Sequence, residues 1–261
     1  MEIIIREDAA QVASLVVQLV KTRLLQKPEL VLGCATGRTM EAIYSALIAE
    51  HQRGLSFSNC STFNLDEYIG LPKEDKRSYH FYMREKLFNH IDILPGNTHL
   101  PNGMADNLDE EAKRYERDIY SSGGIALQLL GLGETGHIGF NEPLSSLQSR
   151  TREKALTPTT RQQNAEMFGG DPDAVPARAL TMGVGTILEA DEIIMVVTGE
   201  TKADILAKAT EGPITAMISA TALQLHRDCK VIVDEAAASQ LQGQDYYRWV
   251  FEHEPEWQRY H

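Results

Sequence analysis

The segment IALQLLGLGETGHIGFNEP, residues 125–143, joins an apolar run to a glycine-rich loop that carries titratable side chains. The run at 125–130 predicts a strand that is buried on both faces of a sheet. Four glycines follow within nine residues, and they mark a loop in which backbone can approach a ligand closely. His137 and Glu142 add an imidazole and a carboxylate to this loop, so the segment predicts an active site at the end of a buried strand.

Two other interpretations of this loop have to be considered. A single histidine after a strand is more often a hydrogen-bonded structural residue, and closely spaced glycines can serve turns alone. From these two facts, a structural role and a catalytic role are about equally supported. Residues 131–136 also match the pattern GxGxxG, but Pro143 stands where a dinucleotide-binding loop would lead into a helix. The match is therefore a weak indication of dinucleotide binding.

Composition limits the class of protein and its partners. The chain has 261 residues, 43% of them hydrophobic and 24% charged, which is typical of a globular protein with a sizeable core. No linker, repeat or low-complexity tract divides it, so a single domain is favoured. The formal net charge of −12 argues against nucleic acid and anionic membrane surfaces as partners. An anionic small substrate would need a local positive pocket.

Cysteine usage and the absence of long apolar runs predict a cytoplasmic protein. Cys34, Cys60 and Cys229 are odd in number and far apart, which argues against a disulfide framework, and no Cys/His pair has zinc-ligand spacing. The N-terminal sequence lacks the features of a signal peptide. No apolar run approaches the roughly 20 residues of a membrane-spanning helix.

Strands and helices are expected to alternate along the whole chain. Strands are expected at 2–6, within 29–39, at 60–65, 125–130 and 178–182, within 191–202 and at 229–235; helices are expected from Asp8 to Pro28 and at 40–53, 78–90, 108–120 and 159–168. This alternation predicts a single α/β domain with a doubly wound, mainly parallel, Rossmann-like sheet and helices on both faces. The tail at 245–261, rich in aromatic and acidic residues, is expected to pack over the body.

Several polar side chains follow the expected strand ends, where such sheets bind ligands. The Thr/Gly loop within 29–39 precedes a helix whose N-terminus suits a phosphate, although a plain tight turn is somewhat more common. Asp66 and Glu67 follow the strand at 60–65, although two acids in such a place are usually solvated. Lys202 lies at an expected helix start, where a cation often faces an anion. Their shared placement with His137 predicts one pocket.

Five motifs, in this order, resemble the glucosamine-6-phosphate deaminase family, also called isomerase. They are FNLDEYIGLP (63–72), GHIGFNEP (136–143), SRTR (149–152), TMGVGTI (181–187) and TGETK (198–202). The resemblance extends from the LGCATG loop to the LQLH segment at 223–226. It implies conversion of an amino-sugar 6-phosphate, here expected to be glucosamine 6-phosphate, to fructose 6-phosphate and ammonia without a metal or redox cofactor.

The resemblance also implies roles for individual residues. Asp66 would be the base that moves a proton between C2 and C1, and His137 would move a proton during ring opening while Glu142 orients its imidazole. The residues implied for phosphate binding are Thr36, Gly37, Thr39 and Lys202.

Three departures from the family pattern lie at this predicted site. Thr135 stands beside the ring-opening histidine where the family usually has Asp or Asn, and we expect it to be a weaker catalytic partner. Arg38 and Met40 change the phosphate loop. Glu166 replaces an arginine that usually contacts phosphate from a mobile lid, here expected at about 160–180. We therefore expect Arg38 to bind the phosphate instead, although a solvent-facing Arg38 is nearly as well supported.

A second anion site is a further hypothesis. Arg150, Arg152 and Lys154 form a basic cluster, for which a solvated face is the more common explanation. By resemblance, Ser145, Arg152 and Lys154 coincide with residues that bind an N-acetylglucosamine 6-phosphate activator in oligomeric members, so a homo-oligomer is also expected. The alternative functions are hydrolysis of a sugar-phosphate lactone, as in 6-phosphogluconolactonase, and a non-catalytic sugar-phosphate sensor. The motif FNLDEY argues against the lactonase, because that reaction needs no enolising base.

Overall fold

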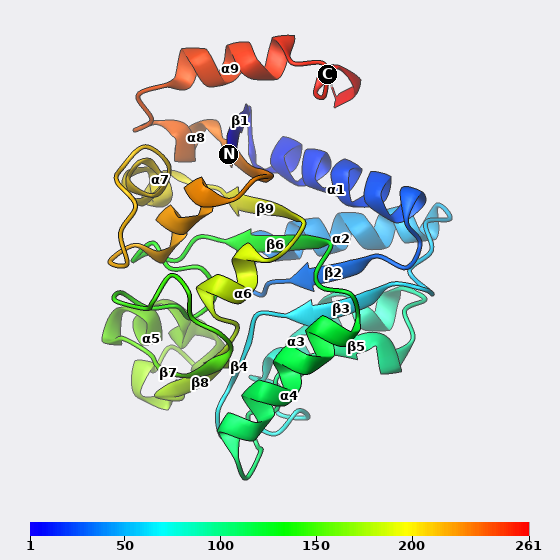
Figure 1. Ribbon diagram of the computed structural model, residues 1–261, viewed down its shortest axis with the longest axis vertical. Helices are drawn as coiled ribbons and strands as arrows, with labels where there is room; N and C mark the ends of the chain where they lie inside the picture. The colour runs from blue at the N-terminus through cyan, green and yellow to red at the C-terminus, as the bar shows by residue number, and fades with distance from the viewer. Residues whose placement is uncertain (261) are drawn as a thin grey trace.

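A seven-stranded parallel sheet forms the body of the computed structural model, which describes residues 1–260 (Figure 1). Its strand order is β1-β10-β9-β6-β2-β3-β5, and every neighbouring pair is parallel. The bounds are β1 Glu2–Arg6, β10 Cys229–Asp234, β9 Glu192–Val197, β6 Leu127–Gly131, β2 Val31–Cys34, β3 Ser61–Asn64 and β5 Thr98–His99. The predicted α/β class is confirmed, and the apolar run that decides it is the central strand β6.

Helices cover both faces of this sheet. On one face lie α1 (Ala9–Gln26), α2 (Arg38–Gln52) and α3 (Tyr79–Lys86), with α2 packed against both α1 and α3. The other face carries α4 (Leu108–Ser121), α6 (Val184–Leu188) and α7 (Ala203–Thr210). None of the described helices is long and apolar enough to cross a membrane.

The first helix begins and ends as its sequence predicts. The Asp8 carboxylate accepts a hydrogen bond from the backbone N–H of Gln11 at 2.8 Å, which caps the N-terminus of α1. Pro28 follows shortly after the last helical residue, Gln26. The apolar residues at spacings of three and four all lie in the core: Val12, Leu15, Val16, Leu19, Val20 and Leu24.

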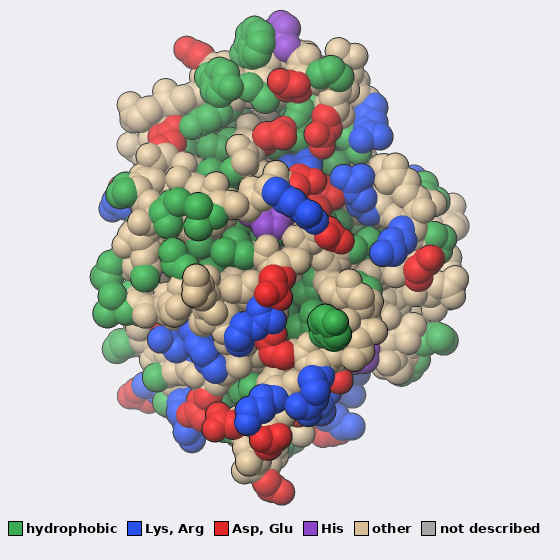
Figure 2. Space-filling view, viewed as in Figure 1, with side chains coloured by type: hydrophobic (Ala, Val, Ile, Leu, Met, Phe, Trp, Pro, Cys, Tyr) green, Lys and Arg blue, Asp and Glu red, His purple; other side chains and the backbone are tan. Residues whose placement is uncertain are grey.

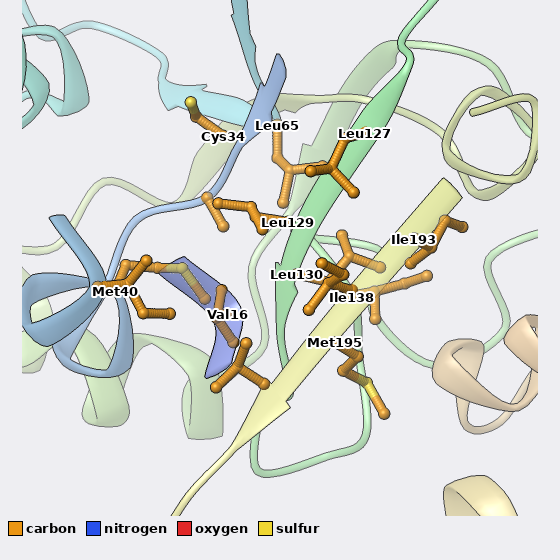
Figure 3. Close-up of a cluster of buried hydrophobic side chains, with 14 of the residues drawn as sticks. Val16, Cys34, Met40, Leu65, Leu127, Leu129, Leu130, Ile138, Ile193 and Met195 are labelled. Carbon is orange, nitrogen blue, oxygen red and sulfur yellow. The ribbon is translucent and has the colours of Figure 1, made fainter. Parts of the chain in front are cut away.

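The core is densest around the central strands. Leu127, Leu129 and Leu130 of β6 are fully buried, because α1 and α2 cover one of its faces and other elements cover the other. Figure 3 shows Val16 and Met40 on one side of β6 and Ile193 and Met195 on the neighbouring strand β9. A strand buried on both faces carries few charged side chains, and the titratable groups of this segment, His137 and Glu142, follow the end of the strand.

Two predicted helices are shorter than expected. The helix predicted at 78–90 ends with α3 at Lys86, because Leu87 leaves the helical region (φ −145°) and a separate 3-10 turn follows at Phe88–His90. The helix predicted at 159–168 is also divided.

This second helix is α5 (Pro158–Asn164), and it is followed by a 3-10 turn at Ala165–Phe168. Gly169 ends that turn in the left-handed region, with φ +73°. A further 3-10 turn lies at Pro172–Ala174.

A second sheet was not predicted. It is antiparallel, with the order β4-β8-β7, and comprises β4 (Asp66–Tyr68), β8 (Arg178–Thr181) and β7 (Arg152–Ala155). The strand expected at 60–65 thus continues, after Leu65, into a strand of a different sheet. Strands of three and four residues are too short to show a clear alternation of apolar and polar residues, so the sequence does not reveal this pairing.

The C-terminal segment packs on the edge strand β1. It contains the short helix α8 (Glu235–Ala238), then α9 (Gln244–His253) and a 3-10 turn at Gln258–Tyr260. Trp257 has no exposed surface, and its indole N–H donates to Glu2 Oε2 at 2.7 Å. This contact closes one edge of the seven-stranded sheet.

We predict that Trp257→Ala lowers the free energy of unfolding by about 3–5 kcal/mol, because it leaves a large cavity beside β1. Urea unfolding followed by circular dichroism measures this change. Trp249→Ala is the matched control, since Trp249 lies in the same segment and is 53% exposed. Equal stability of the two variants would show that the tail does not contribute to the fold.

Candidate active site

A cleft of about 200 Å³ lies where β2, β6 and β9 end, on the side of the sheet that faces α5 and the second sheet. The structure brings together seven of the predicted site residues in its lining: Thr36, Gly37, Arg38, Thr39, Asp66, His137 and Lys202. Thr135 and Glu142 do not line the cleft, but they contact His137. The three residues of the hypothetical second anion site also lie outside its lining.

The His137 imidazole is held by its own loop. It is 7% exposed, and its Nδ1 lies 2.8 Å from Thr135 Oγ1 and 3.6 Å from Glu142 Oε2. A Cβ at Gly133 would lie 2.1 Å from His137 Nε2, so only glycine leaves room for the ring. Burial lowers the pKa of His137 below its usual 6.5, while the Glu142 charge opposes this shift. The ring is therefore mainly neutral near pH 7 and able to accept a proton.

Glu142 connects the histidine loop to α5. It is 2% exposed, and its Oε1 accepts hydrogen bonds from the Thr157 N–H (2.9 Å) and hydroxyl (3.2 Å). Thr157 also caps α5, because its hydroxyl accepts from the N–H of Thr160. Within the described residues, Oε2 has no hydrogen-bond partner, and it is the atom nearest to His137. A small ring displacement would complete that bond.

Asp66 occupies an apolar position at the start of β4. It is 6% exposed, and its Oδ2 accepts a long hydrogen bond of 3.5 Å from Thr181 Oγ1, its partner across the antiparallel pair. The same hydroxyl accepts from the Phe140 N–H at 3.0 Å. Burial, with a smaller contribution from Glu67, raises the pKa of Asp66 to about 8. Such a carboxyl can both take and return a proton near neutral pH.

Glu67 is a structural acid. Its Oε1 accepts from the N–H groups of Tyr68 (2.8 Å) and Tyr79 (3.0 Å), and its Oε2 accepts from the N–H of His80 (2.9 Å). Glu67 therefore satisfies the free amides at the N-terminus of α3. The usual solvated state of acids at a strand end applies to neither Asp66 nor Glu67, since both are buried.

The Thr/Gly loop has the geometry of an anion-binding turn. Gly37 has φ +112°, which a residue with a side chain rarely adopts, and α2 starts at the next residue. The Gly37 carbonyl accepts a hydrogen bond from the Tyr82 hydroxyl at 3.0 Å, so α3 holds this turn in place. The first turn of α2, Arg38 to Met40, lines the cleft beside Thr36, and a helix N-terminus in such a place suits an anion.

Lys202 is the buried cation of the site. Contrary to expectation, it does not lie in the first turn of an α-helix but ends a 3-10 turn, Glu200–Lys202, that precedes α7. Its Nζ is buried and has no hydrogen-bond partner in the described part of the chain. Burial lowers the pKa of Lys202, and Glu134 partly offsets this effect. A buried ammonium without a partner is costly, which indicates an anionic ligand at this end.

Arg38 lies close to Glu166, the acid expected in place of the lid arginine. Its Nη1 lies 3.7 Å from Glu166 Oε2, and the two side chains are 84% and 81% exposed. Such an exposed pair is worth little in free energy, so an anion in the cleft can displace it. Arg38 lines the cleft and is the first residue of α2.

The residues of the hypothetical second anion site lie behind the cleft. Ser145 is buried, and its hydroxyl donates to the Glu142 carbonyl at 2.7 Å. Arg152 Nη1 donates to Asn141 Oδ1 at 2.9 Å, whereas the side chain of half-buried Lys154 makes no hydrogen bond or ion pair among residues 1–260. Arg150 pairs with Glu116 and a second acid, Glu189. Figure 2 shows acidic and basic side chains interspersed on this face of the molecule, not one continuous basic surface.

Four site residues were missed by the sequence analysis. Thr181 lies within the motif TMGVGTI, but its contact with Asp66 depends on the antiparallel pairing. Tyr79 follows the α3 cap and lines the cleft, and Gln163 and Asn164 reach it from α5. No sequence signal marks the last two. Among residues 1–260, no three His, Cys, Asp or Glu side chains are grouped so that they could hold a metal ion.

The sequence is similar to curated proteins over its full length. A family model described as glucosamine-6-phosphate isomerases/6-phosphogluconolactonase matches residues 6–231. A glucosamine-6-phosphate deaminase of Corynebacterium urealyticum is 46% identical over 260 residues, which cover 100% of both chains. One of Hahella chejuensis is 54% identical over 230 residues, 87% of each chain.

Solved structures show the same fold. A protein described as a monomeric glucosamine-6-phosphate deaminase has a TM-score of 0.90 and 44% identity, and the match covers 92% of this chain and 100% of that chain. The 6-phosphogluconolactonase from Trypanosoma cruzi has a TM-score of 0.75 and 19% identity, with 92% and 97% covered. At that identity the second likeness concerns the fold alone.

We predict that Glu142→Gln lowers the pKa of His137 further, because it removes the negative charge that favours the imidazolium. An NMR titration of the imidazole signals measures the shift. Glu254→Gln, an exposed change in the C-terminal tail, should leave the signal of His137 unmoved. A His137 pKa that stays the same or rises in Glu142→Gln would contradict this electrostatic role.

Proposed function

The chain belongs to the glucosamine-6-phosphate deaminase family, and we propose that it converts glucosamine 6-phosphate and water to fructose 6-phosphate and ammonia. The observation that carries the proposal is one cleft beside a helix N-terminus that holds a buried carboxyl, a buried imidazole and a buried ammonium without a hydrogen-bond partner in residues 1–260. Together they supply a base, a proton carrier and a phosphate anchor.

Ring opening is assigned to His137. A neutral imidazole can take the proton of the C1 hydroxyl and deliver it to the ring oxygen as the C1–O bond breaks. The Glu142 charge stabilises the imidazolium that forms between these transfers, and the Thr135 hydroxyl orients Nδ1 at 2.8 Å. Thr135 cannot supply a second negative charge, so we expect Glu142 to provide most of this stabilisation.

Proton transfer between C2 and C1 is assigned to Asp66. The open-chain substrate would present C2 to the carboxylate, which removes the C2 proton while the C1 carbonyl oxygen takes up a proton. The enolamine that forms receives a proton at C1 as its nitrogen gives up one proton. The imine that results at C2 is hydrolysed, which releases ammonia and the ketose. The raised pKa of the enclosed Asp66 carboxyl makes the return step accessible.

Phosphate binding is assigned to Thr36, Gly37, Arg38, Thr39 and Lys202. Lys202 supplies a desolvated positive charge and α2 supplies free amides, while Arg38 can make bidentate contacts. This binding energy lies far from the reacting carbons, so it can be used to hold them in place.

Other expectations extend this proposal. A mobile lid at about 160–180 is supported by its short turns and by the exposed Arg38–Glu166 contact. Activation at Ser145, Arg152 and Lys154 stays a hypothesis, supported by the Lys154 side chain, which has no ion-pair partner among the described residues. So does a homo-oligomer, since one solved relative is described as monomeric. A cytoplasmic location is supported by three cysteines that remain free.

The alternative functions are less well supported. A lactone hydrolase needs no base at C2, and the buried position of Asp66 would then have no use. A sugar-phosphate sensor needs the phosphate anchor but not the His137–Glu142 arrangement. Ammonia release from glucosamine 6-phosphate, measured beside lactone hydrolysis, separates the three.

We predict that Asp66→Asn lowers kcat by about 10²–10⁴-fold with little change in substrate affinity, because it removes the base but keeps the phosphate anchor. Ammonia release gives kcat, and calorimetry with glucosamine 6-phosphate gives the affinity. Entry of solvent deuterium at C2 should also be lost. Normal deuterium entry in the variant would assign the base elsewhere.

We predict that Arg38→Ala raises KM about tenfold, as expected for a lost charge-assisted hydrogen bond, with little change in kcat. Glu166→Gln should lower KM, because it removes a competitor for Arg38 and a charge that repels phosphate. Adding Glu166→Arg to Arg38→Ala should recover much of the loss. Wild-type KM in Arg38→Ala would show that this side chain is not a phosphate ligand.

A further inference from the structure

The cleft contains polar side chains that neither the phosphate anchor nor the proton transfers use. Away from Lys202 and the Thr/Gly loop, these are Tyr79, Glu134, Gln163 and Asn164. Apart from Thr201 next to Lys202, the remaining lining is glycine or apolar, including Leu65, Leu132 and Phe140. A sugar has hydroxyl groups along its whole length, so these four side chains are the candidates for recognising them.

Existing hydrogen bonds leave Gln163 with more free donor capacity than the other neutral side chains of this group. The Tyr79 hydroxyl is engaged with the hydroxyls of Tyr68, at 3.2 Å, and Thr36. The Asn164 Nδ2 uses one of its two N–H groups to donate to the Thr160 carbonyl at 2.9 Å. Gln163 differs from both.

Only one end of the Gln163 amide is used. Its Oε1 accepts a weak hydrogen bond of 3.4 Å from the Glu134 N–H, and no hydrogen bond within the described chain uses its Nε2. That weak contact brings α5 against the histidine loop and fixes which end of the amide is free. The half-buried Gln163 therefore offers a donor to the cleft, beside a Glu134 carboxylate that offers an acceptor.

The position of this pair relates it to the middle of the substrate. Asp66 acts at C1 and C2, and the phosphate on C6 lies at Lys202, so the carbons between them must cross the remaining part of the cleft. The Glu134 charge favours the protonated forms of both His137 and Lys202, raising the pKa of each. Glu134 is thus within electrostatic reach of the ring-opening group and of the phosphate end.

We propose that Gln163 is a specificity-determining residue whose Nε2 donates to the C3 or C4 hydroxyl of the sugar, while the Glu134 carboxylate accepts from that hydroxyl. The proposal rests on the assignment of this cleft to the amino-sugar phosphate. A hydroxyl between a donor and an acceptor is satisfied in both directions, and a substrate lacking it leaves both protein groups unpaired. Because Gln163 belongs to α5, this helix both lines the cleft and contributes to substrate specificity.

Gln163→Ala is the test, and Gln162→Ala is its matched control, because Gln162 precedes it on α5, is exposed and does not line the cleft. We expect Gln163→Ala to raise KM for glucosamine 6-phosphate about tenfold, the effect of one lost hydrogen bond of about 1.4 kcal/mol. The control should keep the wild-type KM. Inhibition by inorganic phosphate should be equal in all three proteins, because phosphate does not reach Gln163.

Deoxy substrates identify the hydroxyl. With the 3-deoxy and 4-deoxy analogues of glucosamine 6-phosphate, wild-type KM should rise for one of them, and for that analogue Gln163→Ala should add no further loss. Wild-type KM in Gln163→Ala, or an equal further loss with both analogues, would overturn the proposal. Weaker inhibition by phosphate in Gln163→Ala would also overturn it, because the residue would then be supporting the phosphate end.

Failure of the proposed function would look different. If the wild-type protein released no ammonia from glucosamine 6-phosphate, the reaction itself would be wrong. Normal wild-type turnover with an unchanged KM in Gln163→Ala would remove only the role of Gln163.

Discussion

Burial of the central strand β6 on both faces is the constraint on which the site depends. Helices cover both faces of the parallel sheet, so most of its strand residues are apolar and the ionisable groups of the site lie where the strands end. The histidine loop follows β6 at this edge, and the Thr/Gly loop and Lys202 follow β2 and β9 beside it. Because the strands are parallel, these three loops meet at one edge of the sheet although they are far apart in the sequence.

The small antiparallel sheet adds what the parallel sheet cannot supply. It takes the chain after β3 into β4 and places Asp66 opposite Thr181, with the carboxyl enclosed and its pKa raised. Glu67, next in sequence, points to the start of α3 and satisfies its amides. Two adjacent acids thus have different roles, because successive residues of a strand face opposite sides.

The charged side chains of the cleft differ strongly in their exposure to solvent. Lys202 is buried and unpartnered in the described chain, whereas Arg38 and Glu166 meet in solvent at the cleft mouth. The desolvated lysine provides strong attraction for a phosphate, and the exposed pair can separate at little cost. Anchoring of the phosphate and access to the cleft therefore depend on different side chains. The α5 segment contacts the loop that carries His137 in two places, through its N-cap Thr157 to Glu142 and through Gln163 to Glu134.

Local sequence determined the elements whose signals are local: the α1 cap at Asp8, the apolar runs of β6 and β9, and the α/β alternation that implies a shared edge. It also marked His137, Asp66 and Lys202 through motifs at strand ends. Tertiary structure decided the rest. The pairing of β4 with β8, the orientation of Glu67, and the reach of Gln163 and Tyr79 into the cleft arise from contacts between residues far apart in the chain. Such contacts leave no periodic signal, because each depends on packing that exists only after the sheet has formed.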